Sequence, residues 1–388
     1  MNRLDGNLIR VGEPVPCDCF DSQGQLLLKK GLVVLSQKQV DFLLERGLFG
    51  QSKSEASSQH TAATNRPASP FQVLDGFLNQ LKQLFSSLAA SAPPTEEKSG
   101  RTDTSASENI FPQRILGMAA NLQKLCEANA DAFLGAIHLH NSAPYVIIHP
   151  VHRAVLCELL GRRKNLSIED RAQLIAAALT SDLSILRLQL ELFKQSTPLQ
   201  PEQQNAIAAH PEDTVKILRS LGVSDPRWLT AVLQHHELLN GKGYPMGLSG
   251  SDISTLPRIL ALADTYTAMV APKGYRKGLL STAAMRHIIL KRGVELDDEL
   301  AIQVVKELGV YPPGAFVKLR SGELAIVVRR GTNPKAPTVK AMLGSRGAPL
   351  LRPIPRNTTA HEYEILDVFE RDAIVAVDLH QLWDVEAA

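Results

Sequence analysis

Residues 235–245 read HHELLNGKGYP, which places two adjacent histidines and a glutamate at the end of an apolar helical stretch, before a loop with glycines and a proline. Adjacent helical residues point about 100° apart, because a turn takes about 3.6 residues. His235 and His236 can therefore reach two metal ions, or one metal ion and a phosphate. The glycines allow backbone amides to approach a ligand closely, and Tyr244 can stack on a base. The alternative is that both histidines are ordinary residues at a helix end.

Helical patterns surround this stretch from about residue 111 to residue 308. Apolar residues recur there at helical spacing, and prolines with acidic first turns mark several helix starts, as in PEDTVKILRSLG, PRWLTAVLQ and PRILALADTYTAMV. The sequence therefore predicts an all-α domain over residues 111–308.

The two ends of the chain have a different pattern. Residues 14–35 contain short β-type runs with Gly turns, and residues 36–47 follow as a short helix, so we expect a small α+β module over residues 1–50. Residues 311–370 hold short β-type runs separated by Gly, Asn and Pro, which predicts a small β-rich, barrel-like module or sheet. The expected fold class is mainly α, flanked by these two modules.

Residues 51–110 are expected to be polar linkers, because they are rich in Ser, Thr and Pro and cannot offset their ordering entropy by burial. Within them, residues 71–90 form an amphipathic helix by spacing, with an apolar face of Phe71, Leu74, Leu78, Leu81, Phe85 and Leu88. That face must pack on something. A homodimer contact, the main domain and a membrane surface would each serve, and packing on protein is favoured.

Composition restricts the class of protein. The 388 residues carry 42 basic and 40 acidic side chains without a long run of either sign, so no nucleic-acid partner is expected. No apolar run approaches the ~20 residues of a membrane span, and we expect a cytoplasmic location. Cys126 and Cys157 fit reduced core thiols, and the pair Cys17 and Cys19 is too close for a usual zinc knuckle.

Four further polar residues occur where helices should be dry or begin. Asp264 shares a helix face with apolar neighbours, and a buried acid must be paired, hydrogen-bonded or bound to a metal. Asp182 raises the same question, although it could also cap a helix. His149 and His210 lie near helix starts, where a lone histidine is usually a structural group. Imidazoles combined with carboxylates suit Zn, Fe or Mn, and a carboxylate can bridge two such ions for phosphoester hydrolysis.

These residues together resemble the HD-GYP family, whose active members hydrolyse cyclic di-GMP with a bi- or trinuclear metal centre in a helical domain. HHELLNGKGYP matches the family element HHE-x-x-D/N-G-x-GYP without a gap, and the resemblance covers residues 111–308. It implies the metal ligands His149, Asp182, His210, His235, His236 and Asp264. It also implies the ligand-binding residues Gly243, Tyr244, Pro245, Lys273 and Arg276, of which the last two match basic residues that face the ligand phosphates.

The sequence departs from the family at the motif that gives the family its name. Where active members have HD-x-GK, residues 181–185 read SDLSI, so Ser181, Ser184 and Ile185 replace the histidine, glycine and lysine. Asp182 remains at the metal-bridging position as the residual catalytic residue. Serine is a poor ligand for late first-row metals, and Ile185 removes a cation that would bind phosphate. We therefore expect Fe, Mn or Zn at reduced occupancy and impaired turnover.

Three hypotheses about function follow. The favoured one is a regulatory protein of bacterial cyclic di-GMP signalling that binds cyclic di-GMP, its linear product or another phosphate ligand, with protein partners. The second is an active metal-dependent cyclic di-GMP phosphodiesterase. The third is a protein-interaction scaffold without a ligand.

Overall fold

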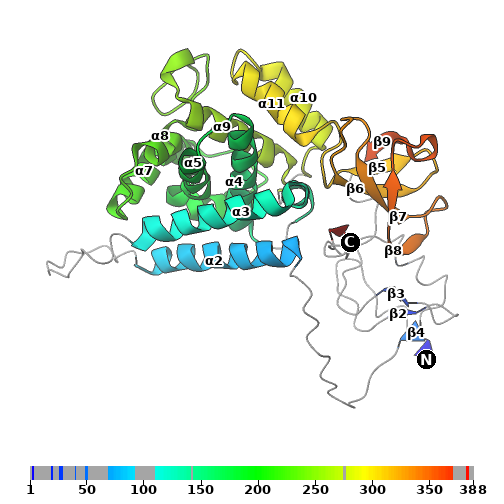
Figure 1. The fold of residues 1–388 in the computed structure, drawn as a ribbon. Coiled ribbons are helices and arrows are strands. Elements are labelled where there is room, and N and C mark those ends of the chain that lie inside the picture. The colour runs from blue at the N-terminus through cyan, green and yellow to red at the C-terminus, as the bar shows by residue number, and fades with distance from the viewer. Residues whose placement is uncertain are drawn as a thin grey trace. The chain divides into compact units, whose positions relative to one another are not determined.

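The structure is a computed structural model in which the chain divides into two compact units, a helical unit and a unit that contains most of the strands (Figure 1). The described residues are 69–91, 110–140, 143–273 and 277–369, with short pieces at 2–3, 19–20, 26–28, 40, 49–50 and 382–383. Each unit is described separately below.

The helical unit comprises residues 70–315 and 329–335. Its α-helices are α2 (Pro70–Ser91), α3 (Ile110–Leu139), α4 (Tyr145–Arg163), α5 (Ile168–Thr180), α6 (Leu186–Lys194), α7 (Pro201–Ser220), α8 (Pro226–Gln234), α9 (Thr255–Val270), α10 (Ser281–Lys291) and α11 (Asp298–Leu308). Two short 3-10 helices, η2 (Leu183–Ile185) and η3 (Gly250–Asp252), interrupt the connections. The mainly α fold class expected from the sequence is confirmed.

Local capping explains where several of these helices begin. The Ser167 hydroxyl accepts a hydrogen bond from Asp170 N at 3.0 Å and starts α5. Asp225 caps α8 in the same way by accepting from Arg227 N at 2.9 Å, and Pro226 occupies the first helical position. At the other end of the unit, α11 ends at Gly309, whose φ of +78° favours glycine.

Helix α4 lies at the centre of the helical unit, where it contacts α3, α5, α9 and α11 (Figure 1). Every residue from 146 to 161 is buried, so the helix is surrounded by protein on all sides. It nevertheless carries four buried polar side chains, His149, His152, Arg153 and Glu158. Because such groups need partners inside the fold, α4 is where a functional site is expected.

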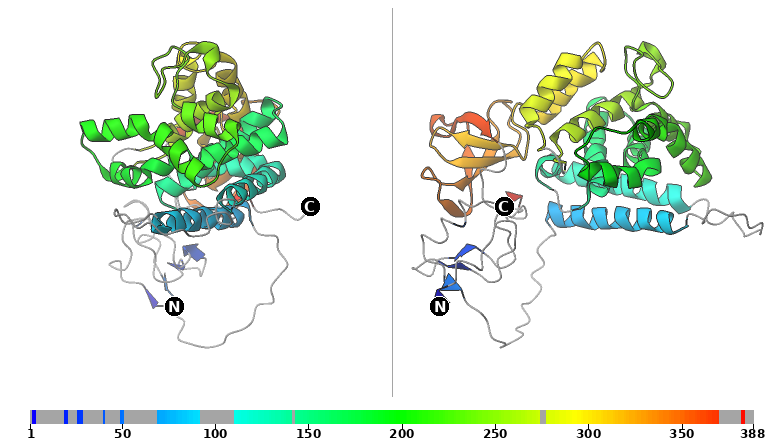
Figure 2. Two further views of the ribbon diagram at one scale, coloured as in Figure 1. Left: turned by 90° about the vertical axis from the view of Figure 1, so that its left-hand side faces the viewer. Right: turned by 180° about the vertical axis from the view of Figure 1, so that it is seen from behind.

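The amphipathic helix α2 packs on the helical unit rather than lying free. Its residues Phe71, Leu74, Leu78, Leu81 and Phe85 are buried, and α2 runs along α3 and also contacts α4 (Figures 1 and 2). The apolar face read from the sequence is therefore covered by the chain itself. Leu88, at the end of that face, is only half-buried.

The strands form two antiparallel sheets. The first has the order β1-β4-β2-β3 and is built from Asn2–Arg3, Phe49–Gly50, Cys19–Phe20 and Leu26–Leu28. The second has the order β8-β7-β6-β5-β9 and is built from Pro349–Asn357, Thr338–Leu343, Leu324–Arg329, Phe316–Leu319 and Ile365–Phe369. Alternating burial along β7 is typical of a strand with one covered face. The small C-terminal β-rich module is confirmed as this second sheet.

Some expectations fall wholly or partly outside the described residues. The short helix expected over residues 36–47 is described only at Val40, which is helical and buried. Cys17 is not described, and Cys19 is described only as part of β2. Cys126 and Cys157 are free and buried, as expected for reduced core thiols, and burial raises the pKa of both thiols.

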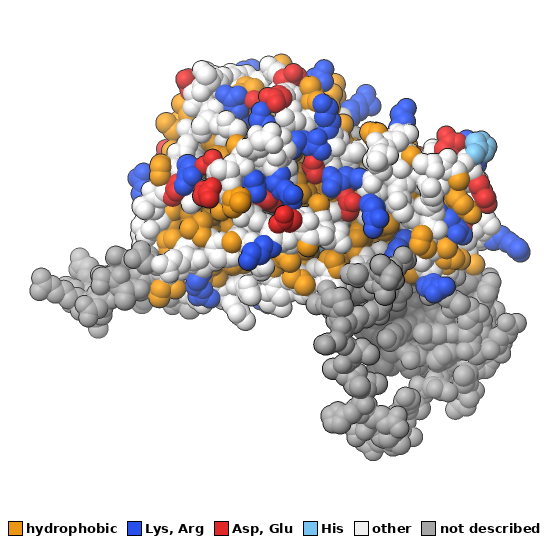
Figure 3. Space-filling view, in the orientation of Figure 1, with side chains coloured by type: hydrophobic (Ala, Val, Ile, Leu, Met, Phe, Trp, Pro, Cys, Tyr) orange, Lys and Arg blue, Asp and Glu red, His pale blue; other side chains and the backbone are white. Residues whose placement is uncertain are grey.

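The described surface is mixed in charge. On the face in Figure 3, Lys and Arg side chains are interspersed with Asp and Glu over the helical unit. This distribution agrees with the formal net charge of +2 for the whole chain. Among the described residues, no helix combines the length and the apolar character that crossing a bilayer requires.

His138 gives the fold a defined dependence on pH. Its Nδ1 donates to Pro313 O at 2.8 Å, and its Nε2 accepts from the hydroxyl of Tyr266 at 2.8 Å, an arrangement that requires the neutral ring. Burial lowers the pKa of His138 from 6.5 to about 4. Between these values the unfolded chain binds a proton that the folded chain does not, so stability is complete above pH 6.5 and falls as the pH drops towards 4.

We expect His138 alone to account for a loss of at most about 3 kcal/mol in the free energy of unfolding over this range. Urea titrations of the wild type and of His138→Gln at pH 7 and pH 4.5, both with chelator, measure it. The variant should lose less stability on acidification than the wild type. An identical loss in both proteins would contradict this assignment.

Candidate functional site

Three histidines meet where the middle of α7 faces the C-terminal end of α8. His210 lies in α7, His235 caps the end of α8, and His236 follows it. One ring nitrogen from each of the three lies within 4.8 Å of the others, and His210 and His235 are buried. We call these three residues the histidine cluster.

The hydrogen bonds of two of these rings fix which nitrogen can bind a metal. Nδ1 of His210 contacts Ile207 O, and Nδ1 of His235 contacts Val232 O, each at 2.6 Å. A carbonyl oxygen only accepts, so both Nδ1 atoms carry a proton, and the nitrogen that can offer a lone pair to a metal is Nε2 in both rings. These two Nε2 atoms face each other at 3.3 Å. Metal-binding histidines typically have this arrangement, with the other ring nitrogen held by a carbonyl or carboxylate.

Burial also favours the neutral ring at His235 and His236. It holds the pKa of His235 well below its usual value, with neighbouring histidines lowering it further, and it lowers the pKa of His236 to about 4. Both rings are therefore uncharged near pH 7 and available as donors. Two facing lone pairs and a third nearby nitrogen form a donor set that suits one divalent ion of the Zn, Fe or Mn type.

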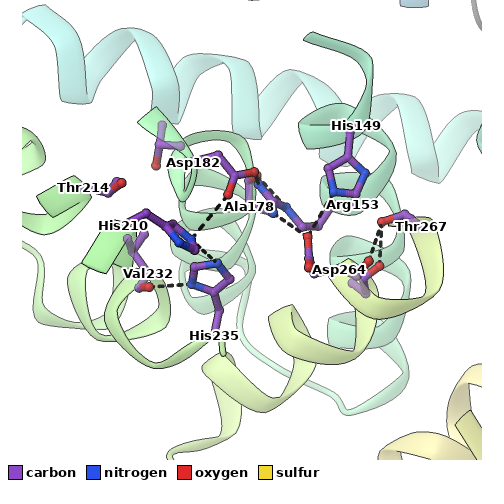
Figure 4. A network of polar contacts seen from close by, with 12 residues as sticks. His149, Arg153, Ala178, Asp182, His210, Thr214, Val232, His235, Asp264 and Thr267 are labelled. Carbon is purple, nitrogen blue, oxygen red and sulfur yellow. Dashed lines mark hydrogen bonds and ion pairs between the residues drawn. The ribbon is translucent and has the colours of Figure 1, made fainter. Parts of the chain in front are cut away.

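Two carboxylates lie beside the histidine cluster, with an arginine between them (Figure 4). Asp182 lies between α5 and η2, Asp264 is in α9, and Arg153 is in α4. Arg153 Nη1 donates to Asp264 Oδ1 at 2.7 Å, and Arg153 Nη2 donates to Asp182 Oδ2 at 3.0 Å. Asp182 Oδ1 lies 3.7 Å from His210 Nε2, which joins this group to the histidine cluster.

Arg153 keeps both carboxylates ionised. Burial alone would raise the pKa of Asp182 and of Asp264, because the charged form is desolvated. The adjacent guanidinium and the neighbouring histidines together outweigh burial and hold the pKa of each carboxyl well below its usual range. Both acids are thus negatively charged at any physiological pH, and Arg153 supplies one compensating positive charge from within the chain.

His149 completes the network at its far end. Its Nε2 lies 3.1 Å from Asp264 Oδ1, and its ring stacks on Tyr145 with the ring centroids 4.7 Å apart. The Lys273 ammonium lies 5.7 Å from the centre of the same Tyr145 ring, a distance at which a cation and an aromatic face attract each other.

The loop after the histidines is held by the glutamate of the HHE element. Glu237 Oε1 accepts from Met246 N at 2.7 Å, and Oε2 accepts from Leu248 N at 2.9 Å. Tyr244 N donates to His236 O at 3.2 Å, and the Tyr244 ring stacks on His236 with the centroids 4.7 Å apart. Glu237 is buried, and both of its carboxylate oxygens are used by loop amides, so its role is to hold the loop.

Comparison with known proteins identifies the helical unit. A family model described as an HD domain matches residues 136–300, which include the histidine cluster, both carboxylates and Arg153. Residues 136–300 thus match the HD domain family, and we call them the HD domain. The HD domain also resembles the HD-GYP type that the motifs indicated. Curated relatives of this chain are named as cyclic dinucleotide phosphodiesterases, which is the activity associated with that type.

Three relatives show how far this similarity extends. A cyclic di-GMP phosphodiesterase of Pseudomonas aeruginosa is 27% identical over 66% of this chain and 60% of its own length. A cyclic di-GMP phosphodiesterase of Borreliella burgdorferi is 28% identical over 52% of this chain and 53% of its own. A 3'3'-cGAMP-specific phosphodiesterase of Vibrio cholerae is 30% identical over 44% of this chain and 37% of its own. Each match spans less than two thirds of the relative.

The HD domain brings together all six residues that the sequence proposed as metal ligands, but in two groups. His210, His235 and His236 form the histidine cluster, whereas Asp182, Asp264 and His149 make their contacts around Arg153. Sequence reasoning missed Arg153. The signal was a charged residue one turn after His149 inside the apolar run VIIHPVHRAVLCELL, where a charge must be paired.

The three positions where the motif is lost have separate structural roles in the HD domain. Ser181 is fully buried, and its hydroxyl has no hydrogen-bond partner among the described residues. The Ser184 hydroxyl donates to His210 O at 3.1 Å and contacts the Thr214 hydroxyl at 2.9 Å, which ties η2 to α7. Ile185 is buried at 8% exposure. A hydroxyl and an aliphatic chain thus stand where the resemblance implied an imidazole and an ammonium.

The proposed ligand-binding residues of the HD domain are described with one exception. Gly243 lies so close to the chain that a Cβ would overlap the backbone of Glu237 and Leu238, and Tyr244 and Pro245 follow it, joined by a cis peptide bond. Lys273 lies near Tyr145. Arg276 lies outside the described residues, so its role remains a prediction.

The donor chemistry fits a metal on one side of the site only. The histidine cluster offers three ring nitrogens, two with lone pairs fixed by backbone carbonyls. The carboxylate side already contains a cation, the Arg153 guanidinium, and lacks a nitrogen donor at Ser181. The residues present therefore fit one divalent ion held by the histidine cluster, and they do not fit a second ion between Asp182 and Asp264.

Proposed function

We propose that this chain is a catalytically impaired HD-GYP-type protein that binds a cyclic dinucleotide or a related phosphate ligand in bacterial cyclic dinucleotide signalling. One observation carries the proposal: the histidine cluster is intact beside two carboxylates that are already paired with Arg153. The names of the relatives indicate the class of ligand.

Weak turnover follows from the chemistry of phosphodiester hydrolysis. A metal ion bound at the histidines would polarise a phosphoryl oxygen and favour ionisation of a bound water. A second ion would require further donors, and Ser181 supplies a hydroxyl in place of a ring nitrogen. Loss of even an outer-shell partner of a metal site costs roughly 10- to 100-fold in affinity or activity. We expect at least that reduction here.

Ligand binding is supported by groups that do not depend on a second ion. The Tyr244 ring lies against His236, and Gly243 keeps the loop backbone close to the histidine cluster. Lys273 provides a nearby positive charge for a phosphate. Cyclic di-GMP and its linear product are the first ligands to test. A cytoplasmic location, protein partners and a homodimer form part of the same proposal.

The test measures binding and hydrolysis on the same sample. Purified protein with Mn²⁺ is titrated with cyclic di-GMP, its linear product and 3'3'-cGAMP by calorimetry, and hydrolysis is followed by chromatography. We expect saturable binding of at least one nucleotide, less than one turnover per hour, and loss of binding in His235→Gln but not in the surface variant Asp213→Asn. Many turnovers per minute would contradict impairment and favour an active metal-dependent phosphodiesterase, the activity that the relatives' names carry. Absence of binding with metal bound would favour a protein scaffold.

A further inference from the structure

The arginine between the two acids is the feature that the proposed function leaves unexplained. Arg153 is 0% exposed, in a helix buried on all sides, and it uses both arms of its guanidinium on carboxylates of two other elements. Burying a cation of this size is costly unless it is paired and hydrogen-bonded. The question is therefore which negative charges make the burial of the Arg153 cation favourable.

The hydrogen bonds of Arg153 show that it is fixed in place. Nε and Nη2 donate to Ala178 O at 3.1 and 2.8 Å, in addition to the bonds from Nη2 to Asp182 and from Nη1 to Asp264 (Figure 4). These four bonds engage all three nitrogens of the guanidinium. The backbone carbonyl of Ala178 anchors the group on α5, so the guanidinium cannot turn away without losing bonds to three residues.

Half of the negative charge of this group is compensated without any added ion. Two carboxylates carry a charge of −2, one guanidinium supplies +1, and His149 contacts the same Asp264 oxygen as Arg153. Arginine remains protonated in proteins, so this compensation does not depend on pH. A divalent ion between Asp182 and Asp264 would lie against a like charge or would have to displace the guanidinium from its four hydrogen bonds.

Position 181 lacks the ring nitrogen that the family resemblance implied as a metal ligand. Ser181 precedes Asp182 and is 0% exposed, and its hydroxyl oxygen has no hydrogen-bond partner among the described residues. The site therefore lacks a nitrogen donor at position 181 and contains the Arg153 cation between the two acids. The serine at position 181 and the buried Arg153 are complementary features. Without a metal ion, the buried carboxylates of Asp182 and Asp264 still need a positive charge beside them, and Arg153 supplies it.

We propose that Arg153 is a built-in cation that takes the place of a metal ion between Asp182 and Asp264, so that the fold needs no metal there and the site binds at most one exchangeable ion. This goes beyond the proposed function, because it holds whether or not a nucleotide binds. It is also independent of any remaining activity.

The experiment compares Arg153→Met, Ser181→His and the double variant with the wild type in the full chain. Ions per chain are measured by elemental analysis after dialysis against Mn²⁺ or Zn²⁺, and melting temperatures are measured with chelator and with metal. Arg171→Met is the matched control, because Arg171 pairs with the buried carboxylate of Glu158 away from the histidine cluster.

We expect at most one ion per chain in the wild type and a second ion in the double variant. With chelator, Arg153→Met should melt on the order of 10 °C lower than the wild type, because two buried carboxylates lose their partner. Added metal should recover a larger part of this loss than it does in Arg171→Met. Two ions per wild-type chain, or equal recovery in both arginine variants, would overturn the proposal. If the Arg153 variants do not fold, the ion count of the wild type still decides.

Discussion

Gly243→Ala is expected to lower the free energy of unfolding by about 3 kcal/mol or more and to abolish nucleotide binding at the histidine cluster. A Cβ at this position would overlap the backbone of Glu237 and Leu238 and the carbonyl oxygen of His236. Backbone atoms cannot move aside as a flexible side chain can, so the loop itself must shift. Inserting a methyl group into a tightly packed site typically costs about 1–3 kcal/mol, and occasionally more. Urea titration and calorimetry with a cyclic dinucleotide measure the two effects.

The matched control for this variant is Gly117→Ala in α3. A Cβ there meets no atom within 4 Å, and the position is in a helix. Alanine should be neutral or stabilise the protein by up to about 1 kcal/mol, because it is a better helix former than glycine. If Gly243→Ala were as stable as the control and still bound nucleotide, the close approach of the loop to the histidines would not matter for binding.

Glu237→Gln should release the loop while leaving the histidine cluster able to bind metal. The carboxylate accepts two backbone hydrogen bonds, from Met246 N and Leu248 N. An amide has one accepting oxygen, and its NH₂ group would face an N–H donor. Leaving a buried donor unsatisfied costs about 1–3 kcal/mol, and hydrogen bonds to charged groups are stronger than neutral ones. We expect a loss of about 2–4 kcal/mol in the free energy of unfolding.

Hydrogen exchange gives the site-specific measurement for Glu237→Gln. The amides of Met246 and Leu248 should lose protection, while metal content per chain stays as in the wild type. Asp213→Asn, in an exposed pair with Lys216, is the control and should change stability by less than about 1 kcal/mol. Loss of metal instead of loop protection would mean that Glu237 is a ligand and that its role in holding the loop is wrong.

The helical fold could be predicted from sequence because it depends on local patterns. The buried face of α2, the cap at Ser167 and the proline at the start of α8 are all visible as short-range signals. The grouping of the candidate site residues followed from a motif, since Asp264 and His210 match family positions that periodicity alone would not have joined. Pattern analysis established only that Asp264 needed a partner.

The identity of that partner could not be predicted, because it depends on tertiary contacts. Arg153 reaches Asp264 across 111 positions of sequence and Asp182 across 29. A single arginine in a helix is normally taken for a surface residue, and only the burial of all sides of α4 rules this out. The role of Glu237 was hidden for a related reason. Its carboxylate lies beside two histidines in sequence, although its partners are backbone amides nine and eleven residues later.

A covalently attached counter-charge has a consequence for how such a protein responds to its surroundings. A guanidinium cannot be chelated, diluted or exchanged, so scarcity or excess of transition metals cannot alter the interior around α4 through Asp182 and Asp264. Sensitivity to metal supply is thereby confined to the three imidazoles of the histidine cluster, one from the middle of α7 and two from the end of α8. Among the described residues, the histidine cluster is then the one position at which a bound divalent ion would exchange with the surroundings.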